Sequence, residues 1–208
     1  WFSTEKTGIV TYDPKATLLV HGGSGFLITG RTDNAAGSLQ ESGPGTKLFF
    51  YPKKAAFRAG HVDSNQWDST TQIDNIGQYS VAFGHNTKAS GEGSAIVGGY
   101  NNTASGRYSV VLGGANNTAG GAYSVAAGTD AIATHPGTFV WNSRMSNDKT
   151  PRFESAVDNQ FIINAPGGVG IGTNRTDDAV LTIQPEPSGP VPQYTAVFRN
   201  ALGDSVAY

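Results

Sequence analysis

A fourfold internal repeat constrains the fold of this chain more than any other feature of its sequence. Residues 77–90, 91–105, 106–120 and 121–134 align as copies of 14, 15, 15 and 14 residues. Each copy opens with Gly, at Gly77, Gly91, Gly106 and Gly121. Ser follows three positions later, at Ser80, Ser94, Ser109 and Ser124. A short period of this kind is typical of solenoids, in which each copy stacks on the next.

Two further columns mark a turn in the middle of each copy. A second Gly comes seven positions after the first, at Gly84, Gly98, Gly113 and Gly128. An Asn or Asp then follows, at Asn86, Asn101, Asn116 and Asp130. This alignment assigns the extra residue of the two longer copies to Gly99 and Gly114. Gly, Asn and Asp all tolerate the left-handed backbone region, so at least some of these positions are predicted to have positive φ.

The apolar residues between the turns predict strands. Ser-Val-Ala-Phe and its counterparts are too short for a helix and rich in β-branched residues, and a second short strand ends at Ala89, Ala104, Ala119 or Ala133. One copy is therefore strand, turn, strand, turn. The predicted fold is all-β, a parallel β-roll or β-solenoid of about four coils that rises roughly 19 Å at about 4.8 Å per coil.

Alternation along the first strand separates two faces. Tyr79, Val81 and Phe83 point to one side and Ser80 and Ala82 to the other, and both faces are apolar or small. Because a thin coil cannot bury both faces, one is predicted to fill its interior and the other to pack on further copies of the chain about a threefold axis. The residues assigned to this coil and trimer core are Ser80, Val81, Ser94, Ile96, Ser109, Val110, Ser124 and Val125.

Composition excludes several other classes. The net charge is −2 and there is no basic stripe, so a nucleic-acid partner is not expected. No apolar run reaches the roughly 20 residues that span a bilayer, so this segment is not expected to insert into a membrane. Without Cys there are no disulfides or thiolate metal sites. The chain begins at Trp1 without an initiator Met or signal-peptide pattern, which predicts a piece of a longer protein.

The G-x-x-S-V-A-x-G…A-x unit of residues 76–135 resembles the head repeat of trimeric autotransporter adhesins, the YadA-like left-handed parallel β-roll. Residues 43–60 and 66–68 resemble the segment that precedes such repeats in phage tail-fibre-like and bacterial surface proteins. Residues 137–144 and 159–174 resemble the segment that closes them. The resemblance implies an elongated homotrimer with an adhesive or structural role, extracellular, at a cell surface or on a virion or tail fibre.

The pattern divides the chain into four parts. Residues 1–75 are expected to form an N-terminal β module, 76–135 the β-roll repeats, 136–184 a closing β module, and 185–208 a Pro-rich linker with the start of a further β module. Strands are expected at 9–12, 17–20, 26–29, 47–51, 55–57, 139–141, 160–164, 169–172 and 180–183. Lys53, Lys54 and Arg58 are interpreted as a solvated strand edge, with a grip on an acidic glycan or another subunit as the alternative.

No catalytic pattern is present. There is no nucleophile elbow, dinucleotide-binding fingerprint, Walker loop or H-E-x-x-H. We therefore expect no catalytic residues, no cofactor and no metal. The histidines, His21, His61, His85 and His135, are scattered singly and are predicted to be structural. The spacing of Asp63, Asp68 and Asp74 fits no calcium-binding loop.

Two sets of residues have both a binding and a structural interpretation. Asn101, Asn116 and Asn174 stand in N-x-T sequons and are candidate glycosylation sites, but turn positions already explain Asn101 and Asn116. Trp67, Trp141 and Tyr100 would suit sugar stacking if exposed, whereas strand-like context favours core or interface packing for both tryptophans.

The sequence as a whole predicts a non-enzymatic structural or adhesive module of an extracellular homotrimeric fibre, with a surface glycan or protein receptor as a further partner. The alternatives are a receptor-binding tail fibre of a bacteriophage or other virus, and a carbohydrate-binding solenoid module. An ice-binding face is disfavoured because the column Lys88, Thr103, Thr118, Ile132 is not a regular Thr array. A glycan hydrolase is disfavoured because the repeats offer only Glu92 and Asp130 as carboxylates.

Overall fold

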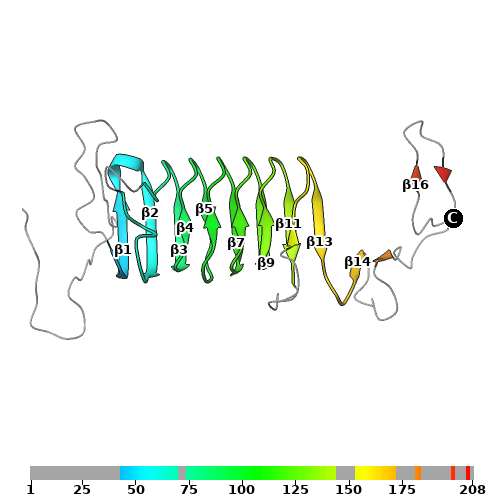
Figure 1. Ribbon diagram of the computed structural model, residues 1–208, viewed down its shortest axis with the longest axis horizontal. Helices are drawn as coiled ribbons and strands as arrows, with labels where there is room; N and C mark the ends of the chain where they lie inside the picture. The colour runs from blue at the N-terminus through cyan, green and yellow to red at the C-terminus, as the bar shows by residue number, and fades with distance from the viewer. Residues whose placement is uncertain are drawn as a thin grey trace, which may run out of the picture.

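A computed structural model describes residues 43–69, 74–143 and 153–171, together with the strand backbones 181–183, 198–199 and 205–206. The described part is all-β and contains no α-helix. Its strands form an elongated parallel β-roll in which successive coils stack side by side (Figure 1). The predicted strands at 9–12, 17–20 and 26–29, and the linker at 185–192, lie outside the described residues.

One long sheet runs the length of the stack. Its eight strands, in spatial order, are β1 (Gly45–Tyr51), β2 (Ala56–Val62), β3 (Val81–His85), β5 (Ala95–Ile96), β7 (Val110–Ala115), β9 (Val125–Thr129), β11 (Phe139–Asn142) and β13 (Phe161–Asn164). β1 and β2 form an antiparallel hairpin around the 3₁₀ turn η1 (Pro52–Lys54). Every later pairing in this sheet is parallel, as coils of one repeat require.

A second sheet closes the other side of each coil. Its five parallel strands are β4 (Lys88–Ala89), β6 (Thr103–Ala104), β8 (Thr118–Ala119), β10 (Ala131–Ala133) and β12 (Phe153–Glu154). Each repeat thus contributes one strand to each sheet, as predicted. The stack extends past the four copies, to β2 on one side and to β11, β12 and β13 on the other. Two separate pairs complete the description, β14 (Val169–Ile171) with β15 (Leu181–Ile183) and β16 (Phe198–Arg199) with β17 (Ser205–Val206).

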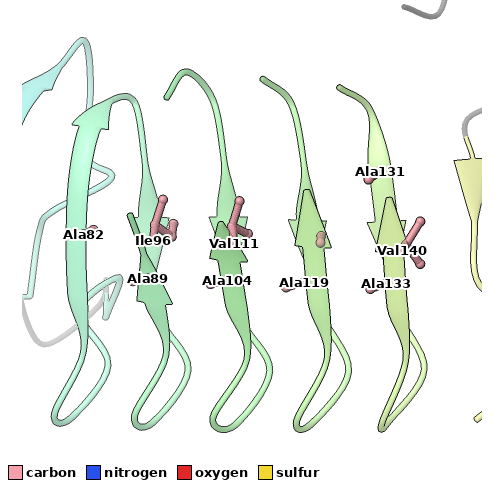
Figure 2. Close-up of a cluster of buried hydrophobic side chains, with 10 residues drawn as sticks. Ala82, Ala89, Ile96, Ala104, Val111, Ala119, Ala131, Ala133 and Val140 are labelled. Carbon is pink, nitrogen blue, oxygen red and sulfur yellow. The ribbon is translucent and has the colours of Figure 1, made fainter. Parts of the chain in front are cut away.

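Small apolar side chains fill the space between the two sheets (Figure 2). The long sheet contributes Ala82, Ile96, Val111, Ala126 and Val140, and the short sheet contributes Ala89, Ala104, Ala119 and Ala133, all fully buried. The repeat serines are also interior. Three of them donate from Oγ to the carbonyl of the glycine that opens their own copy, at 2.6 Å for Ser80, 2.7 Å for Ser94 and 2.8 Å for Ser109. The coil is narrow enough that its core is complete within one chain.

The Asn and Asp column adopts the left-handed conformation that the sequence predicts. φ is +53° at Asn86, +52° at Asn101, +57° at Asn116 and +55° at Asp130. The backbone N–H of each then donates to the coil before it, for example from Asn101 to His85 O at 2.9 Å. This column turns the chain from the long sheet toward the short one.

The assignment of the second glycine column is wrong for the two longer copies. In register, Gly60 pairs with Gly84, and Gly114 pairs with Gly128. A Cβ added at Gly84 would meet the carbonyl of Gly99, and one at Gly99 would meet that of Gly114. The stacked column is therefore Gly60, Gly84, Gly99, Gly114 and Gly128.

Gly98 and Gly113 are the inserted residues. The ladder between β7 and β9 shifts register between Val111 and Gly114, which makes Gly113 part of a β-bulge. An added Cβ at either Gly98 or Gly113 would have no heavy atom within 4 Å. The sequence alignment placed the insertion one residue too late, because adjacent glycines are identical in sequence and only the stacking distinguishes them.

Arg58 and Trp67 cap the start of the short sheet. β4 is its edge strand, and Arg58 donates from Nη2 to Ala89 O at 2.9 Å, while Trp67 Nε1 donates to Thr87 O at 2.8 Å. Both side chains are fully buried, and burial lowers the pKa of Arg58 to about 10. Covering an open strand edge in this way blocks pairing with another chain.

This cap corrects the interpretation of Lys53, Lys54 and Arg58 as one solvated strand edge. Arg58 lies inside the first coil and does not share a solvated edge with Lys53 and Lys54, which are in the η1 turn. Lys54 pairs with Asp74 and donates to Ile76 O. Strand alternation could not separate these residues, because the sequence does not show that Arg58 aligns with Ala82 at the first core position.

Candidate functional site

The outward side of the long sheet carries the largest set of exposed apolar side chains on the roll. Alternation turns one residue outward for each one that faces the core. Val97 and Leu112 are 59% and 51% exposed, and Trp141 and Phe161 at the far end are 41% and 71% exposed. We call this surface the outer face. Along the stack from β3 to β13 its residues are Val81, Phe83, Ala95, Val97 (directly after β5), Val110, Leu112, Val125, Phe139, Trp141, Phe161 and Ile163. Ala127 pairs in register with Trp141 but is only 2% exposed, so it adds nothing to the exposed strip.

The structure separates the predicted coil and trimer core into two groups. Ser80, Ser94, Ser109, Ser124 and Ile96 lie inside the coil. Val81, Val110 and Val125 are half-buried and lie on the outer face, in one register column with Ala95, Phe139 and Phe161. Each strand of the long sheet thus contributes residues both to the filled core of the coil and to the exposed outer face.

Aromatic pairs stand at both ends of the outer face. Phe57 of β2 meets Phe83 with ring centroids 5.9 Å apart, edge to face. Phe139 and Phe161 stack at 4.7 Å. Between them the column consists of Val and Ala, whose small side chains leave a flat strip that another flat surface can approach closely.

A polar column runs along one margin of the outer face. His61, His85 and Tyr100 follow each other on adjacent coils, with 5.1 Å between the His61 and His85 rings and 5.1 Å between those of His85 and Tyr100. Asp63 joins them, with Oδ1 3.2 Å from His61 Nε2 and Oδ2 3.1 Å from His85 Nε2. Hydrogen bonds from Asn86 and His85 hold the pKa of Asp63 below its usual value.

This cluster corrects the interpretation of the histidines as single residues. His61 and His85 each follow a stacked glycine, Gly60 and Gly84, and that shared offset was the available signal. The signal was hidden because 24 residues separate them, whereas the repeats are 14 or 15 long. His135 is apart from the cluster and contacts Ser155 Oγ at 3.0 Å from Nδ1.

A second exposed feature is a column of tyrosines at the opening turns. Tyr79, Tyr108 and Tyr123 have φ of +59°, +55° and +60°, and they are 55%, 40% and 60% exposed. The left-handed region is unfavourable for so bulky a residue. Tyr108 and Tyr123 lie 5.6 Å apart, and Arg107, paired with Glu92 at 3.1 Å, lies 4.5 Å over the Tyr108 ring. Strand alternation placed Tyr79 on the same face as Val81 and Phe83, and this turn conformation was not predicted.

The remaining candidates divide between surface and core. Tyr100 is 45% exposed, whereas Trp67 is fully buried in the cap. Asn101 is exposed and Asn116 is half-buried, both in left-handed turns; Asn174 lies outside the described residues. The structure describes no helix that is long and apolar enough to cross a membrane.

Comparison with protein families identifies the repeat. The family model of the YadA head domain repeat matches in two copies, at residues 76–95 and 99–115. The chain therefore contains YadA-like head repeats, as the G-x-x-S-V-A-x-G pattern indicated. Comparisons with curated proteins and with solved structures gave no match.

Proposed function

We propose that the chain is the adhesive or structural head module of an extracellular fibre, and that it works as a homotrimer joined through the outer face. YadA-like heads form homotrimers and belong to adhesins, which supports both parts of the proposal. The observation that carries it is the outer face itself, a long apolar strip on a coil whose own core is already filled.

The energetics favour self-association. Burying a large apolar side chain that is exposed contributes about 1.5–3 kcal/mol when burial is complete. Val97, Leu112, Trp141 and Phe161 are each more than a third exposed in the single chain. Because the strip runs parallel to the stack, three rods packed around a common axis bury it in every copy. A closed ring of this kind leaves no apolar strip free to recruit further chains.

The mass in solution tests the proposal. We expect about three times the chain mass of 21.7 kDa by analytical ultracentrifugation. The double substitution Val97→Asn and Leu112→Asn should dissociate the trimer while the β-sheet circular dichroism stays. Val157→Asn is the matched control, because Val157 is 57% exposed but lies in a turn outside the outer face. A monomer at every concentration would rule out the trimer.

A viral tail fibre remains the alternative within the same architecture, and the trimer does not distinguish it. Labelling with an antibody raised against the chain does: signal on the producing cell supports a surface adhesin, and signal on phage particles supports a tail fibre. Either location is extracellular.

A carbohydrate-binding role is favoured by one observation, the exposed tyrosines held in strained turns. Aromatic faces suit sugar stacking, and strain in a bulky residue is retained most often where function requires it. Binding of a glycan array by the chain, lost in Tyr108→Ser with Tyr123→Ser, would support this role. Unchanged binding in that variant would exclude the tyrosine column as the contact.

A further inference from the structure

The margin of the outer face brings three metal-ligating side chains together. His61 comes from the end of β2, Asp63 from the loop that follows, and His85 from the end of β3. The nearest ligand atoms of the three residues all lie within 4.8 Å of one another. His61 and Asp63 are two residues apart at a strand end, and the parallel register places His85 beside His61.

The distances within the cluster suit one small cation. Tetrahedral Zn²⁺ holds its ligands at about 2.0–2.1 Å, so adjacent ligand atoms are about 3.4 Å apart. Asp63 already lies 3.2 Å from His61 Nε2 and 3.1 Å from His85 Nε2. The ligand atoms lie within 4.8 Å of one another, so side-chain rotation has to bring them together around one ion. All three side chains are about half exposed, which makes them accessible to the ion.

Neighbouring groups hold the ligands in the orientation that a metal requires. Thr46 Oγ1 lies 2.9 Å from His61 Nδ1, and this contact leaves Nε2 directed toward Asp63. When Nε2 binds a metal, Nδ1 carries the ring proton and donates a hydrogen bond to the Thr46 hydroxyl. A metal-binding histidine almost always donates from its second ring nitrogen in this way. Asn86 Nδ2 donates to Asp63 Oδ2 at 2.6 Å, and Asn86 Oδ1 accepts from the Asp63 N–H at 2.7 Å.

We propose that His61, Asp63 and His85 form a binding site for a divalent transition-metal ion, with Zn²⁺ as its representative. Two imidazoles and one carboxylate are the ligand types that this ion accepts, and a water molecule completes the tetrahedron. The site is built from one chain, so its stoichiometry is one ion per chain whether or not the trimer forms. It joins β2, β3 and the loop that leads to Trp67, and metal therefore stabilises the capped end of the roll.

Calorimetry with the full 208-residue chain, free of a histidine tag and treated with a chelator, tests the site. Titration with ZnCl₂ should give one ion per chain. His61→Gln with His85→Gln should weaken the affinity at least 100-fold, and Asp63→Asn should weaken it 10- to 100-fold. His135→Gln is the control, since His135 contacts Ser155 and should leave zinc binding unchanged.

A second measurement covers the case in which the double variant does not fold. X-ray absorption of the zinc-loaded, unsubstituted chain counts the imidazole ligands directly. Two imidazoles with oxygen ligands are expected. Fewer than two imidazoles, or a folded double variant that binds zinc as the unsubstituted chain does, would overturn the proposal. Neither result depends on the oligomeric state, so the proposed trimer is tested separately.

Discussion

Coils of two lengths stack in one β-roll, and the comparison between them shows which parts of the repeat are free to vary. The first and fourth copies have 14 residues, and the second and third have 15. Their inner residues superpose in register: Ala82, Ile96, Val111 and Ala126 form one uninterrupted column. The extra residue is accommodated as Gly98 or Gly113, where the space around an added Cβ is open.

The longer coils share a second feature, at the position three residues after the stacked glycine. They have a fully buried asparagine there, Asn102 or Asn117, where the first copy has Thr87 and the fourth has Ala131. Each asparagine amide donates to the carbonyl of its own inserted glycine, Asn102 to Gly98 O at 2.9 Å and Asn117 to Gly113 O at 2.9 Å. The insertion and the asparagine thus form one unit.

A longer coil is tolerated when the backbone groups that its extra residue displaces from the ladder find a new hydrogen-bond partner inside the coil. An inserted residue interrupts the ladder, and a buried carbonyl without a donor costs about 1–3 kcal/mol. The asparagine supplies the donor in both longer copies. A 14-residue coil has no inserted carbonyl to satisfy, and Thr or Ala at the same position is sufficient.

The largest effect is expected from substitution of Gly99, and its neighbour Gly98 provides the comparison. Gly99 has φ of +97°, and an added Cβ would clash with the Gly114 carbonyl, so Gly99→Ala should destabilise the roll by about 3–5 kcal/mol. Gly98 lacks both constraints. Gly98→Ala should therefore change stability by less than about 1 kcal/mol, with a gain if the backbone fits.

Urea unfolding followed by circular dichroism measures both variants. The two substitutions are chemically identical and one residue apart, so each controls for the other. Equal losses would mean that the stacked column has been assigned to the wrong glycine in the longer copies.

An intermediate effect is expected at the buried asparagine. Asn117 donates to Gly113 O and Gly128 O, and its Oδ1 accepts from the Ala131 N–H at 2.9 Å. Asn117→Ala leaves these groups without that partner and should cost about 2–3 kcal/mol in the same unfolding experiment. Thr87→Val is the matched control, because Thr87 Oγ1 is buried with no hydrogen-bond partner among the described residues and its loss should be neutral or stabilising. If Thr87→Val lowers the free energy of unfolding as much as Asn117→Ala does, the hydrogen bonds of Asn117 are not what stabilises the longer coil.

Sequence reasoning predicted the repeat, the two strands per coil and the left-handed Asn column, because each follows from local periodicity and turn chemistry. It could not choose between Gly98 and Gly99, since register between coils decides which glycine stacks. It also missed the cap and the His61–Asp63–His85 cluster. Arg58, Trp67 and His61 precede the repeats. Their partners in β3, in β4 and at Thr87 between them are set by long-range pairing that no local pattern shows.

The smallest effect is expected from Lys88, which occupies the surface position that Thr103 and Thr118 hold in the longer coils. Lys88→Thr gives the first copy the residue of its neighbours. An accessible charge contributes little to stability, and Thr suits a strand, so the change in the free energy of unfolding should stay within about 0.5 kcal/mol.

The backbone of Lys88 contributes more than its side chain, since its N–H donates to Asn102 O at 2.8 Å. Lys88→Pro removes that donor from a strand and should cost several times more than Lys88→Thr. If both variants unfold at the same urea concentration as the unsubstituted chain, the ladder between β4 and β6 does not contribute to the stability of the roll. If Lys88→Thr lowers the free energy of unfolding as much as Asn117→Ala does, the two kinds of coil differ in stability through surface charge. The hydrogen bonds of the buried asparagine would then not be what distinguishes them.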